Sequence, residues 1–160
     1  MKEPQWTTDS HHNDDQKEDI DKFLQECEPA FKYTQNILKK CFSNIYNRYV
    51  QSNKHFSIQD QEHYEQRPYA PYTILTINND IAVTMHKDWN GDIDGMECII
   101  VIGDWTQNGN LILEDLNAHI VLKPGDIYFL NSANVFHAVT PYSGGSRYSF
   151  VMFSDKNMIN

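Results

Sequence analysis

The segment TMHKDWNGD, residues 84–92, places a histidine and an aspartate two positions apart where an apolar run ends. His86 and Asp88 follow YTILTINNDIAVTM, a pattern that is typical of two strands and a turn. Residues i and i+2 of a strand point to the same face, so this imidazole and carboxylate can bind one metal ion together. The chain has two other His-x-acid triplets, both in polar segments: His12 with Asp14, and His63 with Glu65.

A third ligand is needed to complete such a site. Two histidines and one carboxylate leave three positions of an octahedral ion open, as in non-haem Fe(II) oxygenases. We favour His137 in NVFHAVTPY, because Val135, His137 and Val139 share one face of a predicted strand. An imidazole among apolar neighbours needs a polar partner, which is either a metal ion or a backbone group. Other histidines stay open for this role: His55, His63 and His119.

The C-terminal segment GGSRYSFVMF contains an arginine and a serine two positions apart on another predicted strand. Burying Arg147 in this apolar run is costly unless its guanidinium pairs with an anion. The planar fork of the guanidinium suits a carboxylate, and the Ser149 hydroxyl can donate to the same group. The anion is either a bound carboxylate or a protein acid such as Asp126.

Short β-like runs separated by turn residues begin at residue 72. Many short strands within one small region favour a sandwich or a jelly roll. We predict eight strands, at residues 72–78, 81–86, 98–103, 109–114, 117–122, 126–130, 135–140 and 146–153.

The part of the chain before residue 72 has a different pattern. Residues 1–16 are polar and acidic without periodicity, and we expect them to be disordered. An amphipathic helix begins in DDQKEDIDKFLQECE, and Pro29 is expected to open a second helix that runs to about Tyr49. The predicted organisation is therefore a disordered tail, a helical segment with a polar connector, and a β core: residues 1–16, 17–71 and 72–160.

Composition limits the partners and the location of the protein. The formal net charge is −9, and the chain from residue 80 onward has four basic and ten acidic residues, so we expect weak nucleic-acid binding at most. No apolar stretch approaches the roughly 18 residues of a membrane span, which predicts an intracellular protein, nuclear or cytoplasmic, with no membrane partner. We interpret the three cysteines as buried thiols of a reducing compartment: Cys27, Cys41 and Cys98.

The order of the motifs resembles the double-stranded β-helix of the Fe(II)/2-oxoglutarate dioxygenases. His137 follows Asp88 by 49 positions, and Arg147 follows His137 by ten. More narrowly, GNLILEDLNAHIVLKPGDIYFLNSANVFHAVTPYSGGSRYSFVMFS resembles the TET/JBP group, and most of all its fungal Tet-like branch. The specific features are KPGDIYFL, the H-x-V-x-P segment around His137, and G-x-R-Y-S. The resemblance covers residues 72–153, about half of the chain.

This resemblance implies a fold, a site and an activity. The fold is mainly β with N-terminal helices, a double-stranded β-helix or jelly roll, in which His86, Asp88 and His137 hold Fe(II). Arg147 binds the distal carboxylate of the cosubstrate 2-oxoglutarate with help from Ser149. The implied activity uses oxygen to oxidise the methyl group of a methylated pyrimidine, 5-methylcytosine or thymine, in nucleic acid.

Two departures from the family pattern leave the substrate open. Many relatives have a glycine pair where this chain has NGN, and many have a longer N-terminal region that shapes the substrate pocket. Two alternatives therefore remain: a dioxygenase that hydroxylates a protein side chain or a small metabolite, and a catalytically silent β-helix that binds a partner. Three further residues either line the pocket or pack in an ordinary way: Tyr72, Asn78 and Trp89.

Overall fold

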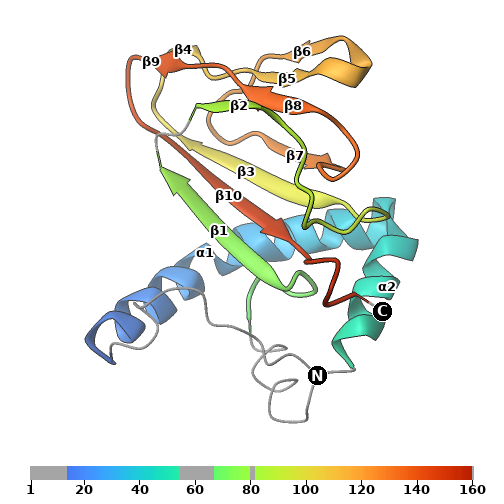
Figure 1. The fold of residues 1–160 in the computed structure, drawn as a ribbon. Coiled ribbons are helices and arrows are strands. Elements are labelled where there is room, and N and C mark those ends of the chain that lie inside the picture. Colours follow the sequence, from blue (N-terminus) through green and yellow to red (C-terminus); the bar gives the residue numbers. More distant parts are fainter. Residues whose placement is uncertain (1–13, 55–66, 80–81, 160) are drawn as a thin grey trace.

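The computed structural model of the chain describes residues 14–54, 67–79 and 82–159. Two antiparallel sheets are stacked, and two helices cover the outer face of one of them (Figure 1). The helices are α1 (Asp14–Cys41) and α2 (Ser43–Asn53), and a short 3₁₀ helix spans Glu114–Leu116. The strands are β1 (Ile74–Asn79), β2 (Val83–His86), β3 (Glu97–Gly103), β4 (Gln107–Asn108), β5 (Leu111–Leu113), β6 (Ala118–Ile120), β7 (Ile127–Leu130), β8 (His137–Val139), β9 (Tyr142–Ser143) and β10 (Arg147–Phe153).

The chain passes back and forth between the two sheets. The major sheet, which lies next to the helices, has the strand order β1-β10-β3-β7, and the minor sheet has the order β2-β8-β5-β6. The strands β4 and β9 form a separate two-stranded pair. Successive strands such as β1, β2 and β3 alternate between the sheets, which is the arrangement of a jelly roll. The predicted fold, mainly β with N-terminal helices, is confirmed.

Each of the eight predicted strands has a counterpart in the structure, displaced by no more than a few residues at its ends. Strands β4 and β9 were not predicted. Each is only two residues long and lies in a segment rich in turn residues. Such a strand is too short to show the alternation of apolar and polar residues that identifies longer strands.

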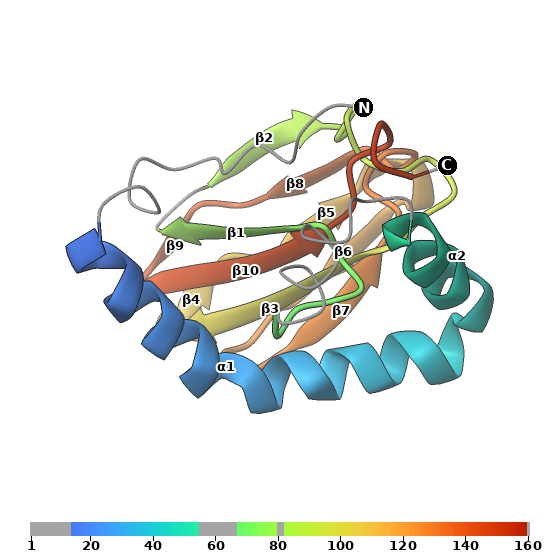
Figure 2. The same ribbon diagram turned by 90° about the horizontal axis from the view of Figure 1, so that it is seen from below.

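The helical segment differs from the prediction at Pro29. The sequence predicts that Pro29 opens a second helix, whereas α1 continues through it to Cys41. Proline lacks an N–H and crowds the carbonyl four residues earlier, which bends a helix without always ending it. Figure 2 shows α1 bent part-way along its length. The break comes at Phe42, whose φ of −132° and ψ of 49° lie outside the helical region.

Two apolar clusters hold the three layers together. Alternation along β3 points Cys98 and Ile100 toward the helices, while Ile99 and Val101 face the minor sheet. The buried residues between the helices and the major sheet are Phe31, Leu38, Tyr49, Tyr72, Cys98, Ile100, Phe150 and Met152. The buried residues between the two sheets are Ile99, Val101, Trp105, Leu111, Leu113, Leu122 and Leu130. The helices therefore belong to the same packed unit as the β core.

Several expectations about the termini and connectors fall outside the described residues. Residues 1–13 cover most of the expected disordered tail, and residues 55–66 cover most of the connector. The helix α1 begins at Asp14, so it includes the last three residues of the expected tail. No helix in the described ranges is long and apolar enough to cross a membrane. The intracellular location stays a prediction.

The three cysteines are free thiols with different exposure. Cys98 is buried, Cys27 is half-buried and Cys41 is exposed. The expectation of buried thiols is therefore confirmed for Cys98 and wrong for Cys41. Cys41 is the last residue of α1, where the helix ends and side chains are less covered.

Candidate active site

The pairing of β2 with β8 brings two of the predicted metal ligands together. His86 lies directly opposite His137, and the centroids of the two rings are 4.3 Å apart. The carboxylate of Asp88, just beyond β2, reaches both rings. Its Oδ1 is 3.3 Å from His86 Nε2, and its Oδ2 is 3.6 Å from His137 Nε2. The three ligand atoms lie within 4.8 Å of one another, and no other group of this kind occurs in the described part of the chain.

The tautomers of the two histidines suit metal binding. His86 Nδ1 is 2.8 Å from the carbonyl oxygen of Thr84, and His137 Nδ1 is 3.0 Å from that of Val135. A carbonyl oxygen only accepts, so each Nδ1 carries the proton and each Nε2 presents its lone pair. Two imidazole nitrogens and one carboxylate are the donor set of the non-haem Fe(II) centre, so these residues fit the predicted metal.

The loop that carries Asp88 is fixed by backbone hydrogen bonds. The Asp88 N–H donates to the carbonyl oxygen of Ser132 at 3.1 Å, and the Gly91 N–H donates to the carbonyl oxygen of Asp88 at 2.8 Å. A Cβ added at Gly91 would lie 3.1 Å from the same Asp88 oxygen. Glycine at this position therefore allows the loop to turn back tightly behind the carboxylate.

Glu97 is a buried carboxyl group beside this loop. It begins β3, and the residue is only 8% exposed. Burial raises the pKa of Glu97 to about 7; the Ser132 hydroxyl lowers this pKa and the Asp88 charge raises it. A Cβ added at Gly91 would lie 3.3 Å from Glu97 Oε1, so the loop and this carboxyl group are close neighbours.

One further histidine lies within the described residues, and it does not join this cluster. His119 lies on β6 opposite Ile112, is exposed, and is not part of the metal-ligand group. The preference for His137 over His119 as the partner of His86 therefore agrees with the geometry. Four histidines lie outside the described residues: His11, His12, His55 and His63.

Arg147 and Ser149 lie on the inner face of β10. Phe150, the next residue of the strand, packs in the helix-facing cluster, so alternation turns its neighbour Ser149 toward the minor sheet. Arg147 is 3% exposed and Ser149 is 7% exposed. Asp126, the alternative partner considered from the sequence, accepts a hydrogen bond from the Lys123 N–H at 2.7 Å.

Trp105 and Gly109 shape the space around Arg147. The guanidinium carbon is 5.5 Å from the centre of the Trp105 ring, within the range of a cation–π contact. The indole Nε1 donates to the Asn108 carbonyl oxygen at 3.1 Å, and a Cβ at Gly109 would lie 3.3 Å from Arg147 Cδ. Asn108 and Gly109 have φ of 60° and 70°. Asparagine tolerates this left-handed conformation, which explains how NGN replaces the expected glycine pair.

Two phenols affect the pKa of Arg147. Burial lowers the pKa of Arg147, whereas Tyr128 and Tyr142 raise it. Burial raises the pKa of Tyr128 to about 12, Arg147 lowers it, and both Glu97 and Asp88 raise it. Tyr128 is thus coupled electrostatically to the arginine and to the metal-ligand loop.

The three further residues singled out in the sequence have different positions. Asn78 pairs with Ser149 across β1 and β10, so both side chains share the inner face. Tyr72 is 1% exposed and its ring lies 5.6 Å from that of Tyr49, in the helix-facing core. Ordinary packing is therefore confirmed for Tyr72. Trp89 is 69% exposed.

Sequence reasoning missed three residues of this region. Glu97 lies two residues before the inward-facing Ile99 on β3, and Tyr128 lies two residues before Leu130 on β7. Residues two apart on a strand face the same side, and this alternation was the signal available for both. Trp105 lies in DWTQNG, which reads as a turn and shows no periodicity, so no sequence signal pointed to it.

Comparison with known proteins identifies the family. The sequence profile of Tet_JBP, described as the oxygenase domain of the 2OGFeDO superfamily, matches residues 4–156. The chain belongs to the Tet_JBP family. The superfamily is named for its use of 2-oxoglutarate and Fe(II), which agrees with the predicted cosubstrate and metal. A search among curated proteins finds no sequence match.

The fold is similar to that of a solved structure, NgTET1 in complex with 5mC DNA. The two chains share 21% sequence identity and superpose with a TM-score of 0.74. The match covers 96% of the present chain and 56% of the NgTET1 chain. The present chain thus spans little more than half the length of that protein, and the likeness shows a shared fold.

Removing a ligand of this Tet_JBP site is expected to abolish metal binding. His86→Ala and Asp88→Ala each take away one of three donors, so we expect loss of stoichiometric Fe(II) or Mn(II) in anaerobic titration calorimetry. His119→Ala is the matched control, because His119 is exposed and lies outside the cluster. Full metal occupancy in both ligand variants, with loss in the control, would show that the assignment is wrong.

Glu97 predicts a pH dependence of stability in the metal-free protein. Its pKa rises from 4.5 to about 7 on folding, so between these values the folded state keeps a proton that the unfolded state has lost. Stability should therefore fall as pH rises through this window, by roughly 3 kcal/mol in total. Glu97→Gln should flatten this decline in urea denaturation, and the exposed control Glu114→Gln should not. An identical decline in Glu97→Gln and the unmodified protein would contradict the prediction.

Proposed function

We propose that this chain is an Fe(II)- and 2-oxoglutarate-dependent dioxygenase that oxidises the methyl group of a methylated pyrimidine in nucleic acid. The observation that carries the proposal is the convergence of His86, Asp88 and His137 in a chain of the Tet_JBP family. The open donor set and the buried Arg-x-Ser on β10 together provide places for a metal and for an oxoacid.

In this proposal His86, Asp88 and His137 hold the Fe(II) ion. The two imidazoles bind through Nε2, because each Nδ1–H is held by a backbone carbonyl. Fe(II) with 2-oxoglutarate and oxygen supplies the oxidising chemistry, in which the oxoacid becomes succinate and carbon dioxide while a substrate C–H bond is oxidised. The protein contributes fixed ligand geometry and a buried arginine that positions the cosubstrate.

Arg147 holds the distal carboxylate of 2-oxoglutarate in this proposal. A guanidinium that is 3% exposed is desolvated, which strengthens its attraction for an anion placed in contact with it. The Trp105 ring and the Gly109 backbone limit the positions that the guanidinium can take. Ser149 lies on the same strand face and can donate its hydroxyl proton to the same carboxylate.

Two observations bear on the substrate. Membership of Tet_JBP and the fold shared with NgTET1, which was solved with 5mC DNA, support a methylated pyrimidine. The net charge of −9 favours an alternative in which the same site hydroxylates a protein side chain or a small metabolite. The cluster of intact ligand side chains supports turnover over a silent binding module.

Succinate formation tests the proposed function. The purified protein is incubated with Fe(II), 2-oxoglutarate and oxygen, with duplex DNA that carries one 5-methylcytosine or with unmethylated duplex of the same sequence. We expect succinate to rise with the methylated duplex, together with a hydroxymethyl product detected by mass spectrometry. Succinate without any dependence on methylation would favour another substrate, and no succinate under any condition would favour a binding module.

The role proposed for Arg147 predicts a selective loss of cosubstrate affinity. Arg147→Ala removes a charge-assisted pair, which costs about 1.5–3 kcal/mol, or roughly a tenfold to hundredfold weaker affinity for 2-oxoglutarate. Arg147→Lys keeps the positive charge but lacks the planar fork, so its affinity for 2-oxoglutarate should lie between those of the unmodified protein and Arg147→Ala. Arg67→Ala is the matched control, because Arg67 contacts Thr73 and Tyr69. Unchanged 2-oxoglutarate affinity in a folded Arg147→Ala variant that still binds metal would refute this role.

A further inference from the structure

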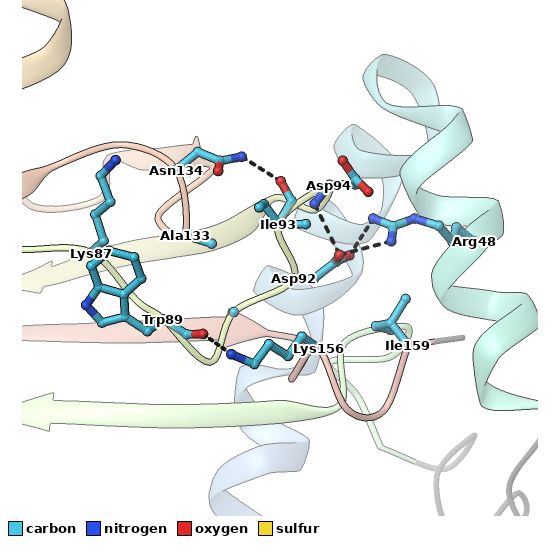
Figure 3. A pocket seen from close by; sticks show the side chains of 11 residues that line it. Arg48, Lys87, Trp89, Asp92, Ile93, Asp94, Ala133, Asn134, Lys156 and Ile159 are labelled. Carbon is cyan, nitrogen blue, oxygen red and sulfur yellow. Dashed lines mark hydrogen bonds and ion pairs between the residues drawn. The ribbon is translucent and has the colours of Figure 1, made fainter.

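A cavity of about 560 Å³ lies next to the metal-ligand loop. Its lining includes Lys87 and Trp89, the residues on either side of Asp88, and extends to Arg48 of α2 and to Lys156 near the C-terminus (Figure 3). The ligand side chains themselves do not line it. The cavity therefore borders the loop that carries Asp88 but does not include the metal-ligand side chains.

The most exposed large apolar side chain at this cavity is the indole of Trp89. Trp89 is 69% exposed, and Ile93 on the same loop is 61% exposed. In contrast Trp105, the other tryptophan among the described residues, is only 5% exposed. Aromatic rings of this size are normally largely covered in a folded chain, so an open indole beside a metal-ligand cluster provides a free face for stacking.

The loop that presents Trp89 is held from three sides. Arg48 forms a two-pronged ion pair with Asp92, one prong of which is 3.0 Å long, and the Lys156 ammonium donates to the Trp89 carbonyl oxygen (Figure 3). The side-chain amide of Asn134 donates to the Ile93 carbonyl oxygen at 2.6 Å. The indole is therefore exposed on an ordered loop, and binding to it costs little ordering entropy.

The charge around the cavity differs from that of the chain as a whole. Three basic side chains line it, Arg48, Lys87 and Lys156, against two acidic ones, Asp92 and Asp94. Asp92 is neutralised by its ion pair with Arg48. The Lys87 ammonium lies 3.9 Å from Asp115, which leaves Lys156 and Asp94 as the remaining opposite charges at the cavity. The cavity is therefore close to neutral in a protein with net charge −9, so a ligand that carries phosphates beside a flat ring meets less repulsion here than the whole chain would predict.

We propose that Trp89 stacks on a base of the nucleic-acid strand that enters the site, while Lys87 and Lys156 contact its flanking phosphates. The inference rests on the proposed function and adds the surface that grips the substrate. A base must leave the duplex before an enzyme can act on it in a site of this kind. A stacking ring stabilises the opened strand. Trp89 directly follows Asp88, so a strand that stacks on it contacts the loop that carries this ligand.

Fluorescence provides a direct test of stacking that does not depend on turnover. The chain has three tryptophans, of which Trp6 lies outside the described residues and Trp105 is buried, so a Trp6→Phe background leaves Trp89 as the exposed emitter. We expect duplex DNA with one 5-methylcytosine to quench this emission with Mn(II) and 2-oxoglutarate present and oxygen absent. The quench should disappear in Trp6→Phe/Trp89→Phe. A quench of the same size in both proteins would overturn the proposal.

Kinetics separate stacking from simple bulk. Trp89→Leu removes the ring and keeps an apolar side chain, and it should raise KM for the methylated duplex by roughly fivefold to a hundredfold. Trp89→Phe keeps an aromatic face and should retain most of the affinity. Tyr33→Ala is the matched control, because Tyr33 is a 60% exposed aromatic residue that does not line the cavity. An unchanged KM in Trp89→Leu would overturn the proposal.

Salt dependence tests the two lysines. Lys87→Gln and Lys156→Gln should each lower the slope of log affinity against log salt by about 0.9 for duplex DNA, and the exposed control Lys123→Gln should not. Equal slopes in all three variants would refute the phosphate contacts.

Methylation-dependent succinate formation with an unchanged KM in Trp89→Leu would contradict this inference alone. A protein that makes succinate without responding to methylated DNA would defeat the proposed substrate and this inference with it.

Discussion

The register between β2 and β8 is the constraint on which the candidate site depends. Val83 lies opposite Val139 and His86 lies opposite His137, so three steps along β2 match two steps along β8. This irregularity is a bulge, and it brings His86 to the face that Val83 occupies. Without it, the period-two alternation of the strand would turn His86 to the opposite face. One extra residue in an edge strand therefore decides whether the two imidazoles can share a metal ion.

The helices contribute to the site through the loop that follows Asp88. Arg48 of α2 pairs with Asp92, and the Tyr49 hydroxyl accepts a hydrogen bond from the Met96 N–H at 3.1 Å. A Cβ added at Gly95 would lie 2.2 Å from the same hydroxyl, so the loop can approach the helix only because this residue is glycine. The helix α2 thus stabilises the metal-ligand loop from outside the two sheets, in addition to covering the major sheet.

The sequence revealed the strands and the ligand types because both leave periodic or compositional signals. Two-residue spacing pointed to the pairs His86/Asp88 and Arg147/Ser149, although Asp88 lies just beyond the end of β2. The order of the motifs carried the family resemblance. The bulge in β2, the continuation of α1 through Pro29 and the stacking of Trp105 on Arg147 left no such signal. Each depends on contacts between segments far apart in the chain, and local propensity is overridden where tertiary packing decides.

Net charge and local charge act on different steps of the proposed reaction. The value of −9 opposes the approach of a polyanion, so it lowers association rates and long-range attraction. It need not oppose binding at the site itself. In the proposed assignment the charges of Fe(II) and Arg147 balance those of Asp88 and 2-oxoglutarate, and the ion pair of Arg48 with Asp92 cancels a further acid at the cavity. A neutral pyrimidine that reaches this region therefore meets no net repulsion. The acidity of the chain limits how often a strand arrives, whereas stacking and ligand geometry decide what happens once it is there.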